Sequence, residues 1–498
     1  MSNGRADSTN FNQNTNPNFP LKNQAMTAPN PTSEILDPAL QKTFLKDKAY
    51  LESTKLPIIT VSATYKEDLK GLHQLKENDR IPDFVFSRAH YSMALAAAVH
   101  AWKGRINPQK AWIVDPSNYV AHQDWFNILL TDAIGRTLAR QPLLKKLKDV
   151  IDKFGRQKLP ILKSITPPLI YLTKDIERPI LSFHIASGNI IAQLGKKVIQ
   201  VVTDPHVRED YLVNADLPNI RFCVFDERTK HEFLEKAHLL GKKVNPNRVI
   251  VTGPPVDPRI IAARSNKQPW ESHRPLRLCL TTGGLGTNKP EIERFLQQIL
   301  PAIKEKRLPI ELMVYAGTHQ DICDLTVELA RVNNLRHKLI KTEDPANFEI
   351  GSQLNHTQQT KLNPHSHLTI LHHPQIVDAN ELLIRFAFPW ADGFITKPSG
   401  DMAYDAAAAG CFLLTLEEWG EWEYNIRAVF EGLGIAQKIQ AVDAVGQLQY
   451  LMGPAALGKI YNPKIHFQPW ITVATRKAHH LEPLFLHGIK KIVDVAKE

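Results

Sequence analysis

Short runs of branched apolar residues alternate with longer amphipathic or alanine-rich segments from about residue 57 onward. The clearest runs are LPIITVSA at 56–63, DFVFS at 83–87, AWIVD at 111–115, KVIQVVTD at 197–204, LRLCLTTGG at 276–284, IELMVYAG at 310–317 and GFITK at 393–397. Alternation of this kind is typical of βα units. The pattern therefore predicts an α/β protein built on parallel sheets.

The length of the chain and one polar segment divide it into domains. A chain of 498 residues is too long for one ordinary core, and the charged, proline-bearing segment 259–275 separates two groups of βα units. The N-terminal residues are rich in Asn, Pro, Thr and Ser, which predicts disorder. We predict a disordered tail at 1–50, Rossmann-like domains at 51–262 and 263–450, and C-terminal helices at 451–498 that pack back across the interdomain cleft.

Charge and cysteine usage narrow the class of protein. The net charge of +10 and the pI near 9.2 suggest an anionic partner, such as a nucleotide, a phospholipid surface or a nucleic acid. The 4 cysteines form no CxxC pair, which fits a reducing cytoplasm. No signal-peptide pattern and no run of 18 apolar residues occurs, so we expect neither export by that route nor a membrane span.

A glycine-rich turn in LCLTTGGLGTNKPEIERFLQQIL, 278–300, is the first candidate for chemistry. A strand ends there, Gly283, Gly284 and Gly286 follow, and a helix begins near Pro290. Backbone amides in such a turn can point at a phosphate. The dinucleotide fingerprint fails because its third glycine position is Lys289, and the P-loop pattern fails as well. The turn is either a phosphate site or a flexible βα connection.

The stretch FITKPSGDMAYDAAAAG, 394–410, has the same strand–turn–helix form. Ser399 can cap a helix that begins at Gly400 and stops at Gly410, and the positive end of that helix suits an anion. Asp405 is then either part of the site or simply solvated. A third element, LEEWGEWEYNIRAVFEGLGIA at 416–436, places acids and aromatic residues before Asn425.

The first half of the chain presents polar residues at its expected strand ends. His90 follows one run at a helix start, and a His is suited to deprotonating a hydroxyl because its usual pKa lies near neutrality. It is equally compatible with a cap or a surface residue. His184 in SFHIASGN and Asp204 in VVTDPHVRED are polar groups that we expect to face the same way.

The segment 136–170 combines basic residues with an apolar stripe at helical spacing. It predicts either a helix on an anionic membrane surface or a core-facing helix with a basic back. Nucleic-acid binding is not expected, because no recognised module appears. Four histidines surround the LTIL run, namely His365, His367, His372 and His373. Strand alternation puts them on mixed faces, so no metal is predicted.

The order and spacing of these motifs resemble the GT-B glycosyltransferases, in particular the group of the monogalactosyldiacylglycerol synthases and the lipid-linked glucosaminyltransferase of peptidoglycan synthesis. The resemblance spans about 82–436. It is carried by VFSRAHYSMALAAAV, VVTDPHV, NRVIVTGPPVDPR, LTTGGLGT, FITKPSGDMAYDAAAAG and Asn425. It implies two Rossmann-like domains with parallel sheets facing across a cleft, the N-terminal one for the acceptor and the C-terminal one for the donor.

The family implies an inverting, metal-independent transferase without a cofactor, which moves a sugar from a nucleotide-sugar, usually a UDP-sugar, to a lipid or other hydrophobic acceptor. It would be cytoplasmic and peripheral on the inner face of the cell membrane, docked through 136–170. His90 would be the catalytic base. The donor residues would be Gly283, Gly284, Gly286, Thr287, Lys397, Ser399, Gly400, Asp405, Glu421 and Asn425, and the acceptor side would hold Arg88, His184 and Asp204.

The chain departs from the family at three positions. Ser87-Arg88-Ala89 replaces a run of glycines before the His, Asp405 replaces a Glu, and Glu421 replaces a Gln. Bulk at the first of these positions leaves open a catalytically degenerate GT-B-fold binding protein. A GT-B-fold enzyme of another class, a nucleotide-sugar epimerase, is the other alternative.

Overall fold

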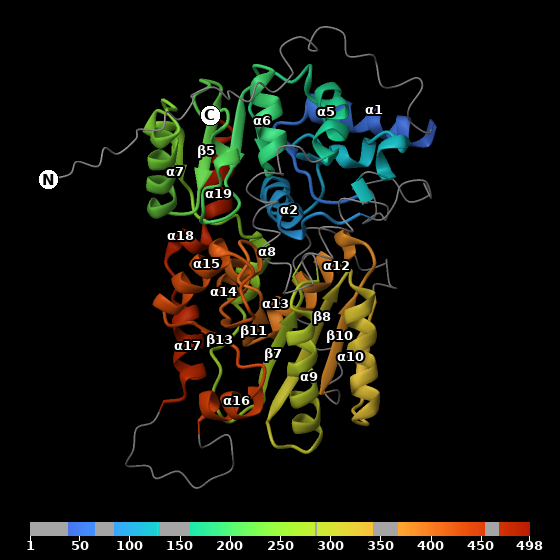
Figure 1. Cartoon of the computed structure of the whole chain (residues 1–498), viewed down its shortest axis with the longest axis vertical. Helices are drawn as coiled ribbons and strands as arrows, with labels where there is room; N and C mark the ends of the chain where they lie inside the picture. The colour runs from blue at the N-terminus through green and yellow to red at the C-terminus, as the bar shows by residue number, and fades with distance from the viewer. Residues whose placement is uncertain are drawn as a thin grey trace, which may run out of the picture.

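Two sheets of parallel strands form the centres of two domains that lie one above the other along the long axis (Figure 1). The computed structural model describes residues 38–64, 84–126, 128–129, 160–283, 286–341, 367–453 and 468–498. The predicted fold class, an α/β protein with two Rossmann-like domains built on parallel sheets, is confirmed.

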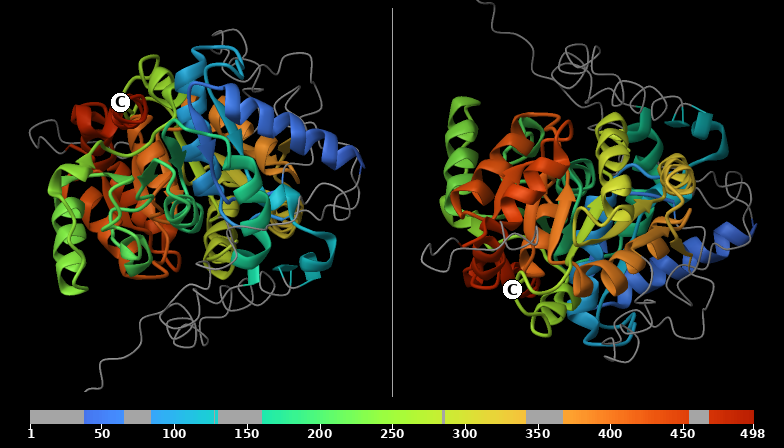
Figure 2. Two further views of the ribbon diagram at one scale, coloured as in Figure 1. Left: turned by 90° about the horizontal axis from the view of Figure 1, so that it is seen from above. Right: turned by 90° about the horizontal axis from the view of Figure 1, so that it is seen from below.

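The N-terminal sheet has the strand order β2-β1-β3-β4-β5-β6. Its strands are β1 (Pro57–Ile59), β2 (Trp112–Val114), β3 (Ile180–Ser182), β4 (Val198–Val201), β5 (Ile220–Val224) and β6 (Val249–Val251). The α-helices of this half are α1 (Pro38–Ser53), α2 (Arg88–Trp102), α5 (Pro160–Thr173), α6 (Ile185–Gln193) and α7 (Glu227–Leu239), with short 3₁₀ turns at Pro116–Tyr119, His122–Asp124, Glu209–Leu212 and Pro246–Arg248. Helices α1 and α7 lie at opposite edges of the domain (Figures 1 and 2).

The C-terminal sheet has the strand order β13-β12-β11-β7-β8-β10-β9. Its strands are β7 (Leu276–Thr281), β8 (Ile310–Gly317), β9 (His337–Ile340), β10 (Leu368–His372), β11 (Gly393–Thr396), β12 (Phe412–Thr415) and β13 (Ala436–Lys438). The helices are α8 (Pro258–Arg264) after β6, then α9 (Lys289–Lys304), α10 (Gln320–Val332), α12 (Ile376–Leu382), a π-helical turn (Leu383–Ala387), α13 (Phe388–Trp390), α14 (Met402–Ala408), α15 (Glu421–Gly432) and α16 (Ala444–Met452).

The strand predicted at 83–87 is wrong. Val85 forms only an isolated antiparallel bridge with Ala63, and the N–H groups of Phe86 and Ser87 both donate to the Ser62 carbonyl, at 2.7 and 2.9 Å. These bonds bend the chain toward α2 instead of extending it along a sheet. The run at 56–63, which lies outside the family resemblance, instead supplies β1, which pairs with both β2 and β3 in the sheet.

The predicted tail also extends too far. Residues 38–50 form most of α1, and this helix is fastened by its aromatic side chain. Phe44 is fully buried, with its ring centroid 4.5 Å from that of Tyr119 and 5.1 Å from that of Tyr171. Residues 1–37 lie outside the described residues.

The described C-terminal helices are α17 (Trp470–Ala478), α18 (Pro483–Leu486) and α19 (Gly488–Val495), and the last of these returns to the N-terminal domain and packs on α2 (Figure 1). Gly253 and Gly488 permit this crossing. A Cβ on Gly488 would lie 2.1 Å from the Pro254 carbonyl oxygen, and one on Gly253 would lie 2.1 Å from that of Leu484. The two domains are therefore connected twice, once through α8 and once through α18.

The predicted membrane-docking segment is described only in its last part, since 136–159 lies outside the described residues. Helix α5 covers that last part and turns its apolar face inward, with Ile165 and Leu169 fully buried. The core-facing alternative is therefore correct for α5. No helix in the described ranges is long and apolar enough to cross a membrane.

Candidate functional site between the two domains

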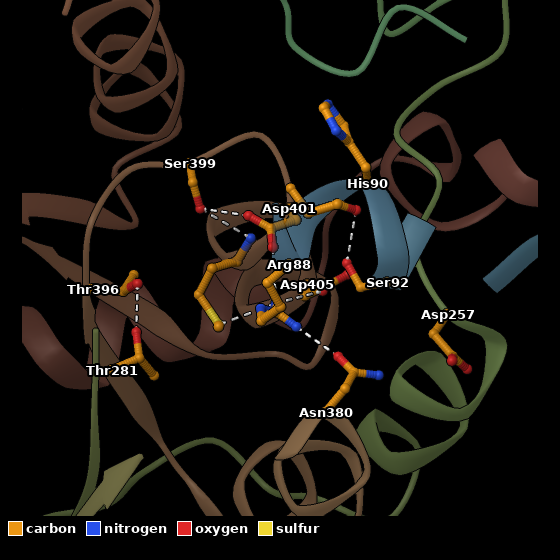
Figure 3. Close-up of polar contacts among 12 residues, drawn as sticks. Arg88, His90, Ser92, Asp257, Thr281, Asn380, Thr396, Ser399, Asp401 and Asp405 are labelled. Carbon is orange, nitrogen blue, oxygen red and sulfur yellow. Dashed lines mark hydrogen bonds and ion pairs between the residues drawn. The ribbon is translucent and has the colours of Figure 1, made fainter. Parts of the chain in front are cut away.

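Arg88 reaches from the first turn of α2 into the other domain. Ser87 is extended and caps α2 by accepting a hydrogen bond from the His90 N–H at 3.3 Å, which fixes where the helix begins. The Arg88 side chain is only 8% exposed, and its Nη2 lies 3.0 Å from Asp401 and 3.8 Å from Asp405. Its Nη1 donates to Asn380 Oδ1 at 2.7 Å. Figure 3 shows the guanidinium between these groups. Arg88, which was predicted on the acceptor side, is therefore bound to the expected donor domain.

The first turn of α14 supplies the two carboxylates. Ser399 caps this turn as predicted, since its hydroxyl accepts from the Met402 N–H at 3.3 Å and donates to Asp401 at 2.6 Å. Asp405 is 6% exposed. Burial raises the pKa of Asp405 well above its usual value; Arg88 opposes this shift and Asp401 adds to it. Asp405, the acid expected to bind a ribose, is therefore paired with Arg88 instead.

Gly400 lies directly against the N-terminal domain. A Cβ at this position would lie 2.5 Å from both the Thr203 carbonyl oxygen and Asp204 Oδ1. The Ser399–Gly400 turn was predicted to face a diphosphate, but here it faces the loop after β4, with no space between them for a methyl group. Asp204 is also paired with Arg208, whose Nη2 lies at 2.9 Å.

The glycine-rich turn adopts a tight conformation in the wall of the C-terminal domain. The Gly286 N–H donates to the Gly283 carbonyl at 2.8 Å, and Gly286 has a φ of 63°, a value that glycine adopts without strain. Thr287 is 2% exposed, and within the described part of the chain its hydroxyl has no hydrogen-bond partner. Gly284 lies outside the described residues. The turn leads into α9, as predicted.

Lys397 lies beside this turn. Its Cδ would be 3.2 Å from a Cβ on Gly283. Its Nζ, however, is 2.6 Å from Glu423, a buried residue of α15 that also accepts from the Trp419 N–H at 2.7 Å. The positive charge of Lys397 is therefore neutralised by Glu423. The sequence analysis singled out Glu421 and not this residue.

A pocket of about 240 Å³ lies between the domains, where the loops of the two halves meet. It is lined by Val85, Arg88, Thr282, Gly283, Tyr315, Gly317, Thr318, His319 and Ile376. Of the predicted residues, Arg88 and Gly283 line it. Glu421 and Asn425 do not: Glu421 is exposed at the start of α15, and the Asn425 side-chain oxygen accepts from Arg228 at 3.4 Å. His319 lines it unpredicted, with Nε2 3.2 Å from the Gly283 carbonyl.

His90 lies apart from the acidic cluster and points away from it (Figure 3). Its Nδ1 is 3.3 Å from the Val61 carbonyl and its Nε2 is 3.5 Å from the Thr203 hydroxyl. The ring of His184 meets it edge-on at 5.0 Å. Burial lowers the pKa of His90 to about 4, with Arg208 adding to the shift and Asp204 opposing it. The imidazole is therefore neutral at physiological pH, and a proton on Nδ1 leaves Nε2 as an acceptor.

The described residues include no group of three or more His, Cys, Asp and Glu side chains placed to hold a metal ion. His367, His372 and His373 are among the residues searched, and His365 is not. Independence from a metal stays a prediction.

Comparison with known protein families and curated proteins says little about the function of this chain. A family described as a domain of unknown function, DUF6938, matches residues 259–405. No curated protein matches the chain.

Solved structures resemble the whole arrangement at low sequence identity. MurG of Acinetobacter baumannii is 14% identical with a TM-score of 0.41, covering 88% of this chain and 98% of its own. The UDP-GlcNAc 2-epimerase of Neisseria meningitidis bound to UDP-GlcNAc is 10% identical with a TM-score of 0.46, covering 88% and 99%. UGT89C1 of Arabidopsis thaliana complexed with UDP-L-rhamnose is 10% identical with a TM-score of 0.43, covering 89% and 100%. The function of this chain must therefore be argued from its own site.

The contact at Gly400 predicts that this position controls closure of the cleft. Gly400→Ala should push the domains apart, because the Thr203 backbone cannot yield to a Cβ. We expect a larger radius of gyration in small-angle scattering and a loss of about 1–3 kcal/mol in the free energy of unfolding. Gly432→Ala is the matched control, since a Cβ there meets nothing within 4 Å. Unchanged scattering and stability for Gly400→Ala would show that the domains are not held in this contact in solution.

Proposed function

We propose that this protein is a glycosyltransferase that binds a nucleotide-sugar, most simply a UDP-sugar, in the cleft between its domains. The observation that carries the proposal is the turn from Gly283 to Thr287. Gly283 lines the interdomain pocket, and Thr287, just before helix α9, has a buried hydroxyl with no hydrogen-bond partner among the described residues. Phosphate groups bind at such helix starts because N–H donors and the helix dipole both favour an anion. In open parallel sheets, ligands bind at the carboxyl ends of the strands, where this turn lies.

We assign distinct tasks to the two domains. The leaving diphosphate would be stabilised by the amides of the glycine-rich turn and by Thr287. His90 would accept the proton of the attacking hydroxyl through Nε2, because its Nδ1 faces a carbonyl oxygen and its low pKa keeps it neutral. A single base acting on one face of the sugar suits direct displacement with inversion.

The acceptor side and the membrane location belong to the same proposal. His184 and Asp204 lie near His90 and Gly400 respectively, on the N-terminal side of the cleft. We propose a lipid or other hydrophobic acceptor, and a location on the cytoplasmic face of the cell membrane. The support is the basic, apolar composition of 136–159. No resident cofactor is proposed, and the reaction needs no metal if the protein donors neutralise the diphosphate.

A catalytically inactive binding protein is the second candidate. One observation favours it: Arg88 is paired with Asp405, the residue from which a ribose contact is expected. Both candidates bind a nucleotide, and only the transferase turns it over.

The proposal predicts stabilisation by one nucleotide family. In a thermal-shift screen with UDP, GDP, ADP, TDP and their sugars, we expect UDP and a UDP-sugar to raise the melting temperature. A ligand present at 100 times its Kd stabilises the folded state by about 2.7 kcal/mol. If no nucleotide stabilises the protein, the proposal is wrong. If the products contain an epimerised nucleotide-sugar and no transferred sugar, the enzyme is an epimerase.

The role of His90 is tested by His90→Gln, which keeps a polar side chain but removes the base. Donor turnover should fall by about 10²–10⁴-fold while nucleotide binding is retained. Because the basic form is the active one and its pKa is about 4, wild-type kcat/KM should be flat above about pH 5 and fall as the pH drops through 4. His238→Gln, at an exposed position of α7, is the control. Unchanged turnover in His90→Gln would remove the catalytic assignment.

A further inference from the structure

The wall of the interdomain pocket carries a single permanent charge among its described lining residues, that of Arg88. The arginine comes from the N-terminal domain, whereas the glycine-rich turn on the opposite wall comes from the C-terminal domain. An anion bound at Gly283 would therefore have a guanidinium facing it. Guanidinium groups bind phosphate oxygens in two-pronged, charge-assisted hydrogen bonds, which are stronger than neutral ones.

Tyr315, from the C-terminal domain, adds a second donor to the pocket lining. It lies near the end of strand β8, is 2% exposed and lines the pocket, and no described group forms a hydrogen bond with its hydroxyl. Burial raises the pKa of Tyr315 to about 12, while Arg88 opposes the shift, so the hydroxyl keeps its proton. A buried donor without an acceptor is unfavourable, and a ligand oxygen would remove that cost.

The present partners of Arg88 cannot all be kept when a nucleotide-sugar enters. The pocket volume of about 240 Å³ includes space open to solvent, and its enclosed part is no larger than about one water molecule, far too small for a nucleotide-sugar. The domains must therefore part to admit the ligand. Asp401, Asp405 and Asn380 all belong to the C-terminal domain, so parting lengthens every one of these contacts at once. When the domains close again around the ligand, the guanidinium is buried once more and needs an anion there, because an unpaired buried charge is strongly unfavourable.

We propose that Arg88 and Tyr315 form an anion subsite for the diphosphate of a nucleotide-sugar, and that Asp401 and Asp405 hold Arg88 in place while the site is empty. The inference rests on the proposed function for the identity of the ligand. When the donor binds, Arg88 exchanges the carboxylates for phosphate oxygens. Asp405 is then released to accept hydrogen bonds from ribose hydroxyls. Arg88, which stands where the family has a glycine, would then bind the nucleotide-sugar instead of blocking the cleft.

The test compares ligands that differ only in phosphate. Binding of inorganic pyrophosphate, UDP and uridine is measured by isothermal titration calorimetry for wild type, Arg88→Gln and Tyr315→Phe. Uridine shares the base and ribose of UDP, so any loosening of the domains changes both affinities, and their ratio reports the phosphate contact. Arg274→Gln is the matched control. It breaks the ion pair between the partly exposed Arg274 and the buried Asp392, at 2.7 Å, and Arg274 does not line the pocket.

We expect Arg88→Gln to weaken pyrophosphate binding, and to lower the UDP-to-uridine affinity ratio, by about tenfold or more. Tyr315→Phe should lower both by about three- to tenfold, and Arg274→Gln should leave both unchanged. Two results would overturn the inference: no pyrophosphate binding to wild type, or an unchanged ratio in both pocket variants. The second result would leave the proposed function standing, with Arg88 a domain tie only. Arg88-dependent pyrophosphate binding without binding of any nucleotide would instead keep the subsite and remove the proposed function.

Discussion

The ion pairs from Arg88 to Asp401 and Asp405 join the two domains across the cleft, and the geometry of the site depends on them. A buried ion pair loses hydration that its Coulombic attraction only partly restores, so it adds little net stability. Its effect is to select one arrangement, because removing either partner leaves an unmatched buried charge. With Arg88 in place, the Ser399–Gly400 turn lies against Thr203 and Asp204, and the pocket between the domains is too small for a nucleotide-sugar.

The position of Arg88 also links closure of the two domains to the position of His90. His90 and Arg88 stand in the same first turn of α2, so a movement that carries the guanidinium toward or away from the C-terminal domain also carries the imidazole. A phosphate that replaces two carboxylates as the partner of Arg88 exchanges one set of charged hydrogen bonds for another. The free-energy difference between the two states can then be small, which is the condition for a ligand to shift the balance between them. The second connection, through α18, is fixed at one end by the close contact between Gly253 and Gly488.

Local patterns in the sequence were sufficient for much of this fold. The parallel sheets, the glycine-rich turn and the Ser399 cap depend on neighbouring residues, and these were predicted. The strand predicted from DFVFS does not form, because the Ser62 carbonyl accepts hydrogen bonds from N–H groups that a strand would donate to its neighbour. The partners of Arg88 were beyond such reasoning, since Asn380 is 292 positions away and nothing local marks it. Asp401 stood inside the quoted stretch, and its place in the first helical turn was the one available signal. The pairing of Lys397 with Glu423 likewise depends on how α15 packs.

The most direct test of this account is a structure of the full chain determined with bound UDP. The account predicts a diphosphate between the Gly283 turn and Arg88, with the guanidinium and the Tyr315 hydroxyl within hydrogen-bond distance of phosphate oxygens. Asp401 would no longer be paired with Arg88, and Gly400 would have moved away from Thr203. A structure that holds UDP elsewhere, with the ion pair between Arg88 and Asp401 intact, would contradict it.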